Sequence, residues 1–339
     1  SLYARVLDVH LEEAFSVMAD MVCRPALRDL ETEREVVLEE IAMYEDDPQD
    51  KVFDVLGEAV FGDHPLGRAI IGRAPVISRV DRDGLAAFHR RRYRPPHVVV
   101  AAAGSVDHDR VVELVAATEG RGEGEGAAAT LGPVPPLRPQ VRFVRKDTEQ
   151  VHACLGGRGI PRDDDRRFAL RVLDTILGGT SSSRLFQEVR EKRGLAYAVY
   201  SFASLYAGTG QVGLYVGTRA ENLGPALEVV AAELRRCAED PASEAELQRA
   251  KENAKGRYVL SLESTSSRMN RLGSAVLAGL PILSDDEVLE RVDAVTMDDV
   301  RALAAELYAP GNLSAAGIGP DEDAFRAALE PLGLEAAAA

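Results

Sequence analysis

The chain has few cysteines and no long apolar segment. Its only cysteines are Cys23, Cys154 and Cys237, which are widely spaced and include no Cys-x-x-Cys pair. This pattern argues against a disulfide framework and against a thiolate metal site, and it favours a reducing compartment. No apolar run is long enough to cross a membrane as a helix. A cytoplasmic location is therefore the default expectation.

Positive charge is also in short supply. The formal net charge of -15 argues against nucleic acid or an anionic membrane as the main partner. The remaining composition, 46% hydrophobic and 28% charged residues, is that of a globular protein. Because 339 residues exceed what one hydrophobic core usually organises, we expect two domains.

The segment from Asp29 to Tyr44 is the most informative stretch of the chain. On a helical wheel, Glu33 and Glu40 project from the middle of one broad apolar face. The apolar members of this face are Leu30, Val36, Val37, Ile41, Met43 and Tyr44. Two carboxylates within an apolar stripe are costly unless a cation meets them. The two glutamates therefore either pair with arginines at a domain surface or act as a metal ligand and a helper carboxylate.

Dense glycine and proline without periodicity predict a linker over residues 119–140. It separates residues 1–118 from residues 141–339. Before it we expect helices over 3–23, 29–46, 52–61, 81–92 and 107–117 and a strand over 97–103. After it we expect strands at 141–146, 150–158, across 195–218 and at 312–318, and helices at about 164–177, 183–193, 221–238, 243–262, 266–278, 284–293 and 297–307.

Two passages on either side of the linker resemble each other at a constant offset of 215 residues. The matched pairs are Tyr93 and Tyr308, Pro95 and Pro310, Ala101 and Ala316, and Gly104 and Gly319. The helical segments that precede both tyrosines keep the same register. This agreement predicts an internal duplication. Since the second repeat begins near residue 141, the start of the first would precede Ser1, and we expect the first repeat to be truncated.

The same offset places Gln248 opposite Glu33 and Lys255 opposite Glu40. The carboxylate pair therefore belongs to the first repeat only. His64 stands alone in the turn motif DHPLG, and we interpret it as structural.

A second candidate segment covers residues 178–202, GGTSSSRLFQEVREKRGLAYAVYSF. Ser182 is the expected cap of its helix, and Gly194 suits the helix end. Arg190 falls in the last turn, where a cation complements the helix dipole. Tyr197 begins an alternating strand, where ordinary packing is the simplest interpretation.

The segment LETEREVVLEEIAMYEDDP resembles the third-ligand helix of the pitrilysin/insulinase zinc metallopeptidases, which include the mitochondrial processing peptidase. These enzymes are the inverzincins, named for an H-x-x-E-H zinc motif. The resemblance implies an α+β fold of two homologous domains, each an antiparallel-rich sheet covered by helices. It implies that Glu40 is a Zn²⁺ ligand and that Glu33 is the carboxylate that supports the catalytic site.

The resemblance also extends to the second repeat, which would be a degenerate peptidase-like domain. Its Arg-x6-Tyr arrangement is similar to the family's substrate-binding pair. By that resemblance, Arg190 and Tyr197 would hold backbone carbonyls of a peptide and steady the tetrahedral intermediate. Donors aimed at a developing oxyanion make a large contribution to catalysis.

The histidine ligands and the general base of the family are expected upstream of Ser1. The six histidines of the chain contain no His-x-x-x-His pair. Because a catalytic zinc ion needs three protein ligands, we expect the chain by itself to be inactive. The resemblance implies that the parent protein is a zinc metalloendopeptidase for peptides or unfolded segments, acting as a homodimer or with a paired subunit. The alternative is a non-catalytic processing or scaffold subunit of the same fold that binds peptides.

Overall fold

The computed structural model describes residues 1–94, 97–118, 132, 134, 138–239 and 242–334. Most of the predicted linker, and Pro95 of the repeat, lie outside these residues. The chain divides into two compact units. Unit 1 comprises Ser1–Ile41, Gly72–Leu131 and Tyr258–Ile282, and unit 2 comprises Ala42–Ile71, Gly132–Arg257 and Leu283–Ala339.

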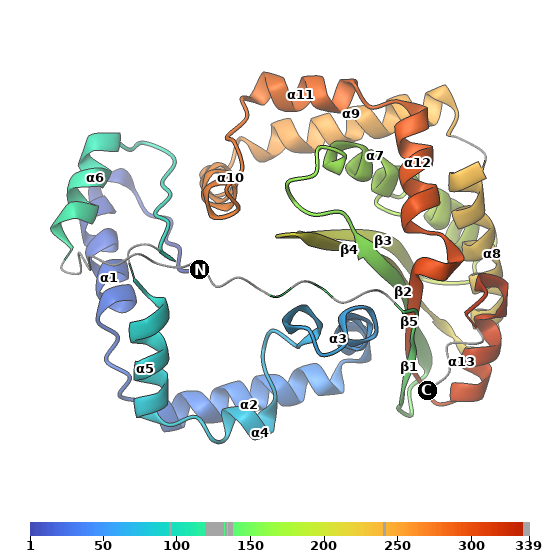
Figure 1. The fold of residues 1–339 in the computed structure, drawn as a ribbon, viewed down its shortest axis with the longest axis horizontal. Coiled ribbons are helices and arrows are strands. Elements are labelled where there is room, and N and C mark those ends of the chain that lie inside the picture. Colours follow the sequence, from blue (N-terminus) through green and yellow to red (C-terminus); the bar gives the residue numbers. More distant parts are fainter. Residues whose placement is uncertain (95–96, 119–131, 133, 135–137, 240–241, 335–339) are drawn as a thin grey trace. The chain divides into compact units, whose positions relative to one another are not determined.

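A five-stranded mixed sheet organises unit 2 (Figure 1). Its strands, in spatial order, are β1 (Val141–Arg145), β5 (Leu313–Gly319), β2 (Gln150–Gly159), β4 (Thr209–Arg219) and β3 (Ala198–Tyr206). β1 and β5 run parallel, and the other neighbours are antiparallel. β3 pairs only with β4, so it forms one edge of the sheet.

Both faces of this sheet are buried, because helices cover each of them. On β2 and β4, Leu155 and Leu214 enter one core, whereas their neighbours Cys154 and Tyr215 enter the other. This is the alternation that the strand repeat of two residues requires. The helices of unit 2 are α3 (Pro48–Phe61), α7 (Arg167–Leu177), α8 (Ala220–Glu239), α11 (Asp285–Asp293), α12 (Met297–Leu307), α13 (Glu322–Ala328) and α9 (Glu244–Ser261) as far as Arg257. Short helical turns lie at Pro65–Gly67, Phe186–Glu191, Pro310–Asn312 and Glu330–Leu332.

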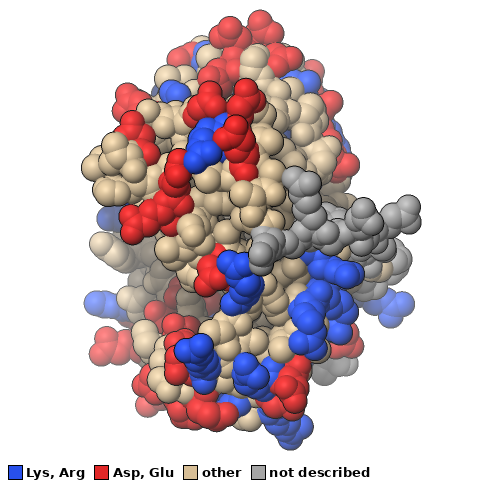
Figure 2. All heavy atoms as spheres, turned by 90° about the vertical axis from the view of Figure 1, so that its left-hand side faces the viewer, with Lys and Arg blue, Asp and Glu red and all other residues tan. Residues whose placement is uncertain are grey.

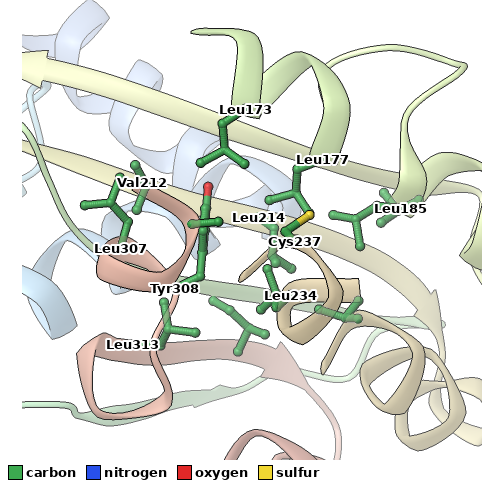
Figure 3. Close-up of a cluster of buried hydrophobic side chains, with 14 of the residues drawn as sticks. Leu173, Leu177, Leu185, Val212, Leu214, Leu234, Cys237, Leu307, Tyr308 and Leu313 are labelled. Atoms are coloured by element: carbon green, nitrogen blue, oxygen red, sulfur yellow. The ribbon is translucent and has the colours of Figure 1, made fainter. Parts of the chain in front are cut away.

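The larger core lies between the sheet and α7, α8, α12 and α13, and the smaller core lies under α3 (Figure 1). Figure 3 shows the centre of the larger core, where side chains from three helices meet those of the sheet. Its labelled members are Leu173, Leu177, Leu185, Val212, Leu214, Leu234, Cys237, Leu307, Tyr308 and Leu313. Burial raises the pKa of the Tyr308 hydroxyl and of the Cys237 thiol, the latter to about 11. Both side chains therefore act as neutral packing groups.

Truncation of this core is expected to be costly. Leu173 is fully buried, so Leu173→Ala should lower the free energy of unfolding by about 2–5 kcal/mol through lost contacts and a residual cavity. Urea unfolding followed by far-ultraviolet circular dichroism measures this loss. Ile70→Ala is the matched control, since Ile70 belongs to the same unit and is fully exposed. Equal stability of the two variants would contradict this account of the core.

The regular elements described in unit 1 are all helical. Its elements are η1 (Asp8–His10), α1 (Leu11–Cys23), α2 (Leu30–Asp46) as far as Ile41, α4 (Ala74–Ile77), α5 (Arg82–Arg92), α6 (His108–Ala117) and α10 (Thr265–Leu277). Aspartates cap two of these helices: Asp81 accepts from the Gly84 N–H at 2.7 Å, and Asp107 accepts from the Arg110 N–H at 2.9 Å. Such caps fix helix starts that can be identified from sequence.

Two predictions for unit 1 are wrong. The first helix begins at Asp8 rather than at residue 3. Residues 97–103 do not form a strand, because no strand is described beside them that could complete a ladder. Their counterpart at the repeat offset is β5, which has a partner on each side.

Helices in the two halves of the chain correspond as the predicted duplication requires. α5 (Arg82–Arg92) and α12 (Met297–Leu307) correspond at the offset of 215 residues over their whole lengths. The repeats also exchange equivalent segments: Ala42–Ile71 joins unit 2, and Tyr258–Ile282 joins unit 1. In unit 2 the exchanged helix α3 contacts β5. In unit 1 the exchanged helix α10 approaches the equivalent residues, since a Cβ at Gly273 would lie 3.3 Å from the Ala101 Cβ.

The α+β class is thus confirmed, with its sheet in unit 2. The predicted domain boundaries at residues 118 and 141 stay a prediction. Among the described residues, no helix is both long and apolar enough to cross a membrane. Figure 2 shows that charge is unevenly spread on one face, with acidic side chains prominent above and basic side chains gathered below. Locally positive surface regions therefore exist although the chain has a net charge of -15.

Candidate functional site

Arg190 lies on η4 (Phe186–Glu191), which is a single π-helical segment. The Lys192 N–H donates to the Gln187 carbonyl at 2.9 Å, the spacing of a π-helix. π-helical turns are rare and are frequent at functional sites. The helix expected here is therefore present in another form. Gly194 ends it with a φ of +61°, as expected.

The predicted cap by Ser182 is wrong. No side chain caps η4, and the Ser182 hydroxyl lies 3.2 Å from the Thr180 hydroxyl instead. Arg184 and Leu185, directly before η4, are already helical, and Leu185 occupies the cap position in place of a serine.

The Arg190 guanidinium lies against two aromatic rings. Its Cζ lies 4.7 Å from the ring centroid of Phe186 and 4.6 Å from that of Tyr197. Its Nη1 also donates to the Tyr197 carbonyl at 3.0 Å, and its Nε lies 3.6 Å from Glu191 Oε1. Two ring contacts together with a hydrogen bond restrict the orientation of the guanidinium. Arg190 is thus oriented in advance, beyond what a helix-dipole role requires.

Tyr197 immediately precedes the edge strand β3 and is 76% exposed. Its alternate neighbours on the strand, Val199 and Ser201, are buried. The interpretation of Tyr197 as ordinary core packing is therefore wrong, because its ring lies against Arg190 and otherwise faces solvent. The structure brings together the two residues that the sequence singled out in the second repeat.

Arg190 and Tyr197 line a pocket of about 410 Å³ within unit 2. Its walls are Gly178, Gly179, Thr180, Ser181, Phe186, Arg190, Tyr197, Ala198, Val199, Tyr200 and Arg257. Glycine is required at 178, since a Cβ there would lie 2.3 Å from the Ser201 backbone nitrogen. Gly178 and Gly179 therefore form a turn at the end of α7 and also allow its backbone to lie close to β3.

Asp174 lies behind this close approach. The Ser201 hydroxyl donates to Asp174 Oδ1 at 2.5 Å. Burial raises the pKa of Asp174, while this hydrogen bond and the charges of Arg171 and Arg257 act in the opposite direction. The carboxylate joins α7 to β3 and supports the wall of the pocket.

The carboxylates of α2 lie in unit 1, and the wheel interpretation of this helix needs a correction. Ile41 is buried and Leu30, Arg34 and Val37 are partly buried, so they form the packed face. Glu33, Val36, Glu40, Met43 and Tyr44 are all exposed on another face. The single broad apolar face is therefore wrong. A wheel gives the angles of side chains and not the side on which neighbours pack.

The carboxylates of Glu33 and Glu40 make no hydrogen bond or ion pair with a described residue. The alternative that arginines neutralise them is thus wrong for the part of the chain that the structure describes. In the second repeat, the side chains at the equivalent positions have partners of their own. Gln248 donates to Glu252 at 3.0 Å, and Lys255 pairs with Glu252 at 2.9 Å and with Asp293 at 2.8 Å.

The described residues include no group of three or more His, Cys, Asp or Glu side chains that could hold a metal ion. Because a catalytic zinc ion takes three protein ligands, Glu40 can provide only one of them and does not complete a centre here. His64 is structural, as predicted. Its Nδ1 accepts from the Leu66 N–H at 3.2 Å, and its Nε2 lies 3.3 Å from the Gly132 carbonyl.

Comparison with known proteins agrees with this arrangement. Residues 1–74 match the family model described as Insulinase (Peptidase family M16), and residues 79–254 match that described as Peptidase M16 inactive domain. An uncharacterized zinc protease of Streptomyces coelicolor is 43% identical over 319 residues, which cover 90% of this chain and 68% of the relative. The chain belongs to the M16 peptidase family. The predicted membership of the pitrilysin/insulinase type is confirmed.

Further M16 similarities have the same extent. An uncharacterized zinc protease of Bacillus subtilis is 38% identical over 90% of this chain and 75% of its own length. A crystal structure of a peptidase M16 inactive domain from Pseudomonas fluorescens has a TM-score of 0.84 and 25% identity, covering 93% of this chain and 76% of that one. A protease from Helicobacter pylori, at 21% identity, shares the fold with a TM-score of 0.85 over 92% of this chain and 77% of that one.

Two residues of this M16 site were missed from the sequence. Phe186 precedes Arg190 by four residues, and that helical spacing is a signal that could have identified the stacked pair. Arg257 lies far along the chain on α9, and no local pattern connects it to the pocket. Only the packing of α9 reveals it.

Proposed function

We propose that this M16 chain is the peptide-binding part of a zinc metalloendopeptidase that cleaves peptides or unfolded segments. The observation that carries the proposal is the Arg190 site. It combines an arginine that contacts the rings of Phe186 and Tyr197, an exposed tyrosine, and a pocket beside an edge strand. These are the features needed to hold an extended peptide by its backbone.

In this proposal Arg190 and Tyr197 bind carbonyl oxygens of the peptide. One Arg190 N–H donates to the Tyr197 carbonyl and Nε lies near Glu191, which leaves the other N–H groups of Nη1 and Nη2 for a ligand. Donors held in place before the substrate arrives stabilise developing negative charge without reorganisation. The unpaired edge of β3 offers further backbone N–H and C=O groups to the same peptide.

Zinc enters the proposal through Glu40. Relatives at 38% and 43% identity are named zinc proteases. Glu40 is an exposed carboxylate with no partner among the described residues, and Glu33 is a second one two turns away on the same face. We assign Glu40 as one zinc ligand and Glu33 as its supporting carboxylate. The other ligands would come from residues other than those described. Bound zinc supplies the Lewis acid for peptide hydrolysis.

A second candidate is a non-catalytic peptide-binding subunit of the same fold. The observation in its favour is the lack of a three-ligand group among the described residues, together with the match to the M16 inactive-domain model. In either case we propose a peptide as the ligand and a homodimer or a paired subunit as the assembly.

Metal removal separates the two candidates. For a zinc peptidase, chelation of the full-length protein should abolish cleavage of a quenched fluorescent peptide, and added zinc should restore it. The measurement is the initial rate of fluorescence increase, with a mock-dialysed sample as control. Peptide binding without any cleavage, in metal-loaded protein, would favour the non-catalytic subunit and contradict the peptidase.

A further inference from the structure

Arg257 is a second cation in the pocket that contains Arg190. It lies on α9 (Glu244–Ser261), and its side chain forms part of the pocket wall. Arg257 is exposed, and it makes no hydrogen bond or ion pair with a described residue. Its charge lowers the pKa of the partly buried Asp174, but that carboxylate accepts a hydrogen bond from the Ser201 hydroxyl and not from Arg257. The guanidinium is thus free to bind a ligand.

The pocket wall is positive in a chain that is negative overall. The wall includes Arg190 and Arg257 but no aspartate or glutamate, although the chain carries a net charge of -15. Glu191 lies 3.6 Å from the Nε of Arg190 and is half exposed. Asp174 is partly buried behind the wall and accepts a hydrogen bond from the Ser201 hydroxyl. Neither of these carboxylates neutralises Arg257 within the pocket.

Arg190 and Arg257 differ in their contacts, which suggests that they bind different groups of a ligand. Arg190 is stacked, oriented and already engaged with one backbone carbonyl of its own chain. Arg257 has no such engagement, and an unpaired guanidinium matches a carboxylate in shape as well as charge. A peptide whose carbonyl is held by Arg190 would bring its neighbouring groups within the same pocket.

We propose that Arg257 makes this pocket selective for a peptide carboxylate next to the segment held by Arg190. The carboxylate is either an aspartate or glutamate side chain or the peptide's own C-terminus. This selectivity rests on the proposed peptide-binding function and adds to it a substrate class, peptides with an acidic group.

The test measures equilibrium binding of labelled short peptides to the full-length protein by fluorescence anisotropy, with a zinc chelator present so that turnover does not compete. One peptide carries a single glutamate and blocked ends, a second carries glutamine in its place, and a third is neutral with a free C-terminal carboxylate. The variants are Arg257→Gln and the matched control Arg249→Gln. Arg249 is also exposed on α9 but lines a different pocket.

We expect the wild type to bind one of the two carboxylate peptides about tenfold more tightly than the glutamine peptide. Arg257→Gln should reduce that ratio to about one, and Arg249→Gln should leave it unchanged. The ratio should also shrink as salt rises from about 50 to about 500 mM, because an exposed charge pair is screened. Whichever peptide shows the preference identifies the source of the carboxylate.

Equal binding of all three peptides by the wild type, or a preference that survives Arg257→Gln, would overturn the selectivity. If binding of the glutamine peptide still falls on Arg190→Ala, the proposed peptide-binding function stands while the role of Arg257 fails. Lack of binding by every peptide would overturn both. Arg257→Lys distinguishes guanidinium recognition from simple charge, since it should recover only part of the preference.

Discussion

Replacement of Arg190 by alanine is expected to lower kcat/KM for peptide cleavage by about 100-fold, with the zinc content unchanged. The variant removes a guanidinium that is oriented by contacts with Phe186 and Tyr197 before any substrate binds. It leaves α2 untouched, because Arg190 and the glutamates belong to different units. Steady-state cleavage of a quenched peptide by the full-length protein, with metal analysis of the same sample, measures both quantities.

The control for Arg190 is Arg193→Ala in the same helical turn. Arg193 pairs with Glu188 at 2.5 Å and complements the same helix end, but it lies outside the pocket. If Arg190 acted only through the helix dipole, the two variants would behave alike. Equal turnover by Arg190→Ala and the wild type would rule out the assigned role. Arg190→Lys should also remain impaired, because lysine has no planar group to lie against the rings.

Replacement of Glu40 by glutamine in the full-length protein is expected to reduce bound zinc from about one ion per chain to nearly none. The neutral amide is a poor ligand, and no nearby carboxylate on α2 has the geometry to replace it within the same turn. Metal content after gel filtration, measured by mass spectrometry, gives the stoichiometry directly. Added zinc should raise the thermal unfolding temperature of the wild type, because it binds the native state, and should not raise that of the variant.

Glu39→Gln is the matched control for Glu40. Glu39 is the neighbouring exposed carboxylate on the same helix, and its side chain points about 100° away. The Glu39→Gln variant should retain zinc. Glu33→Gln should also retain zinc but lower turnover, as expected for a supporting carboxylate. Full zinc retention by Glu40→Gln would exclude Glu40 as a ligand.

Much of the fold could be predicted because its signals are local. Asp81, Asp107 and Thr296 cap helices whose starts follow directly from those residues. The duplication could also be identified, since α5 and α12 keep one register throughout. Whether residues 97–103 form a strand could not be predicted in this way. A strand needs hydrogen-bonding partners, and a local sequence pattern does not show whether partners are present.

The site was predicted only in part, for a similar reason. Arg190 and Tyr197 are close in sequence, and their pairing follows from a helix that leads into a strand. The π-helical form of η4 and the place of Arg257 depend on tertiary packing, which leaves no local trace. On α2, the charged residue Arg34 lies on the packed side and donates to the Val80 carbonyl at 2.6 Å, which the wheel alone does not reveal. The packed side of an amphipathic helix is decided by its neighbours.

The exchange of helical segments limits how the two copies of the duplicated protein can diverge in evolution. The chain passes between the two units five times, so a cut in the 119–140 linker would not free two self-sufficient halves. Residues 141–339 alone would lose α3 and expose the sheet face that Val52, Leu56 and Phe61 now cover. A copy that has lost its acidic pair, with Gln248 and Lys255 in place of the glutamates, is therefore still needed to complete the fold of the other. Mutual dependence of this kind preserves the second copy whether or not it takes part in chemistry.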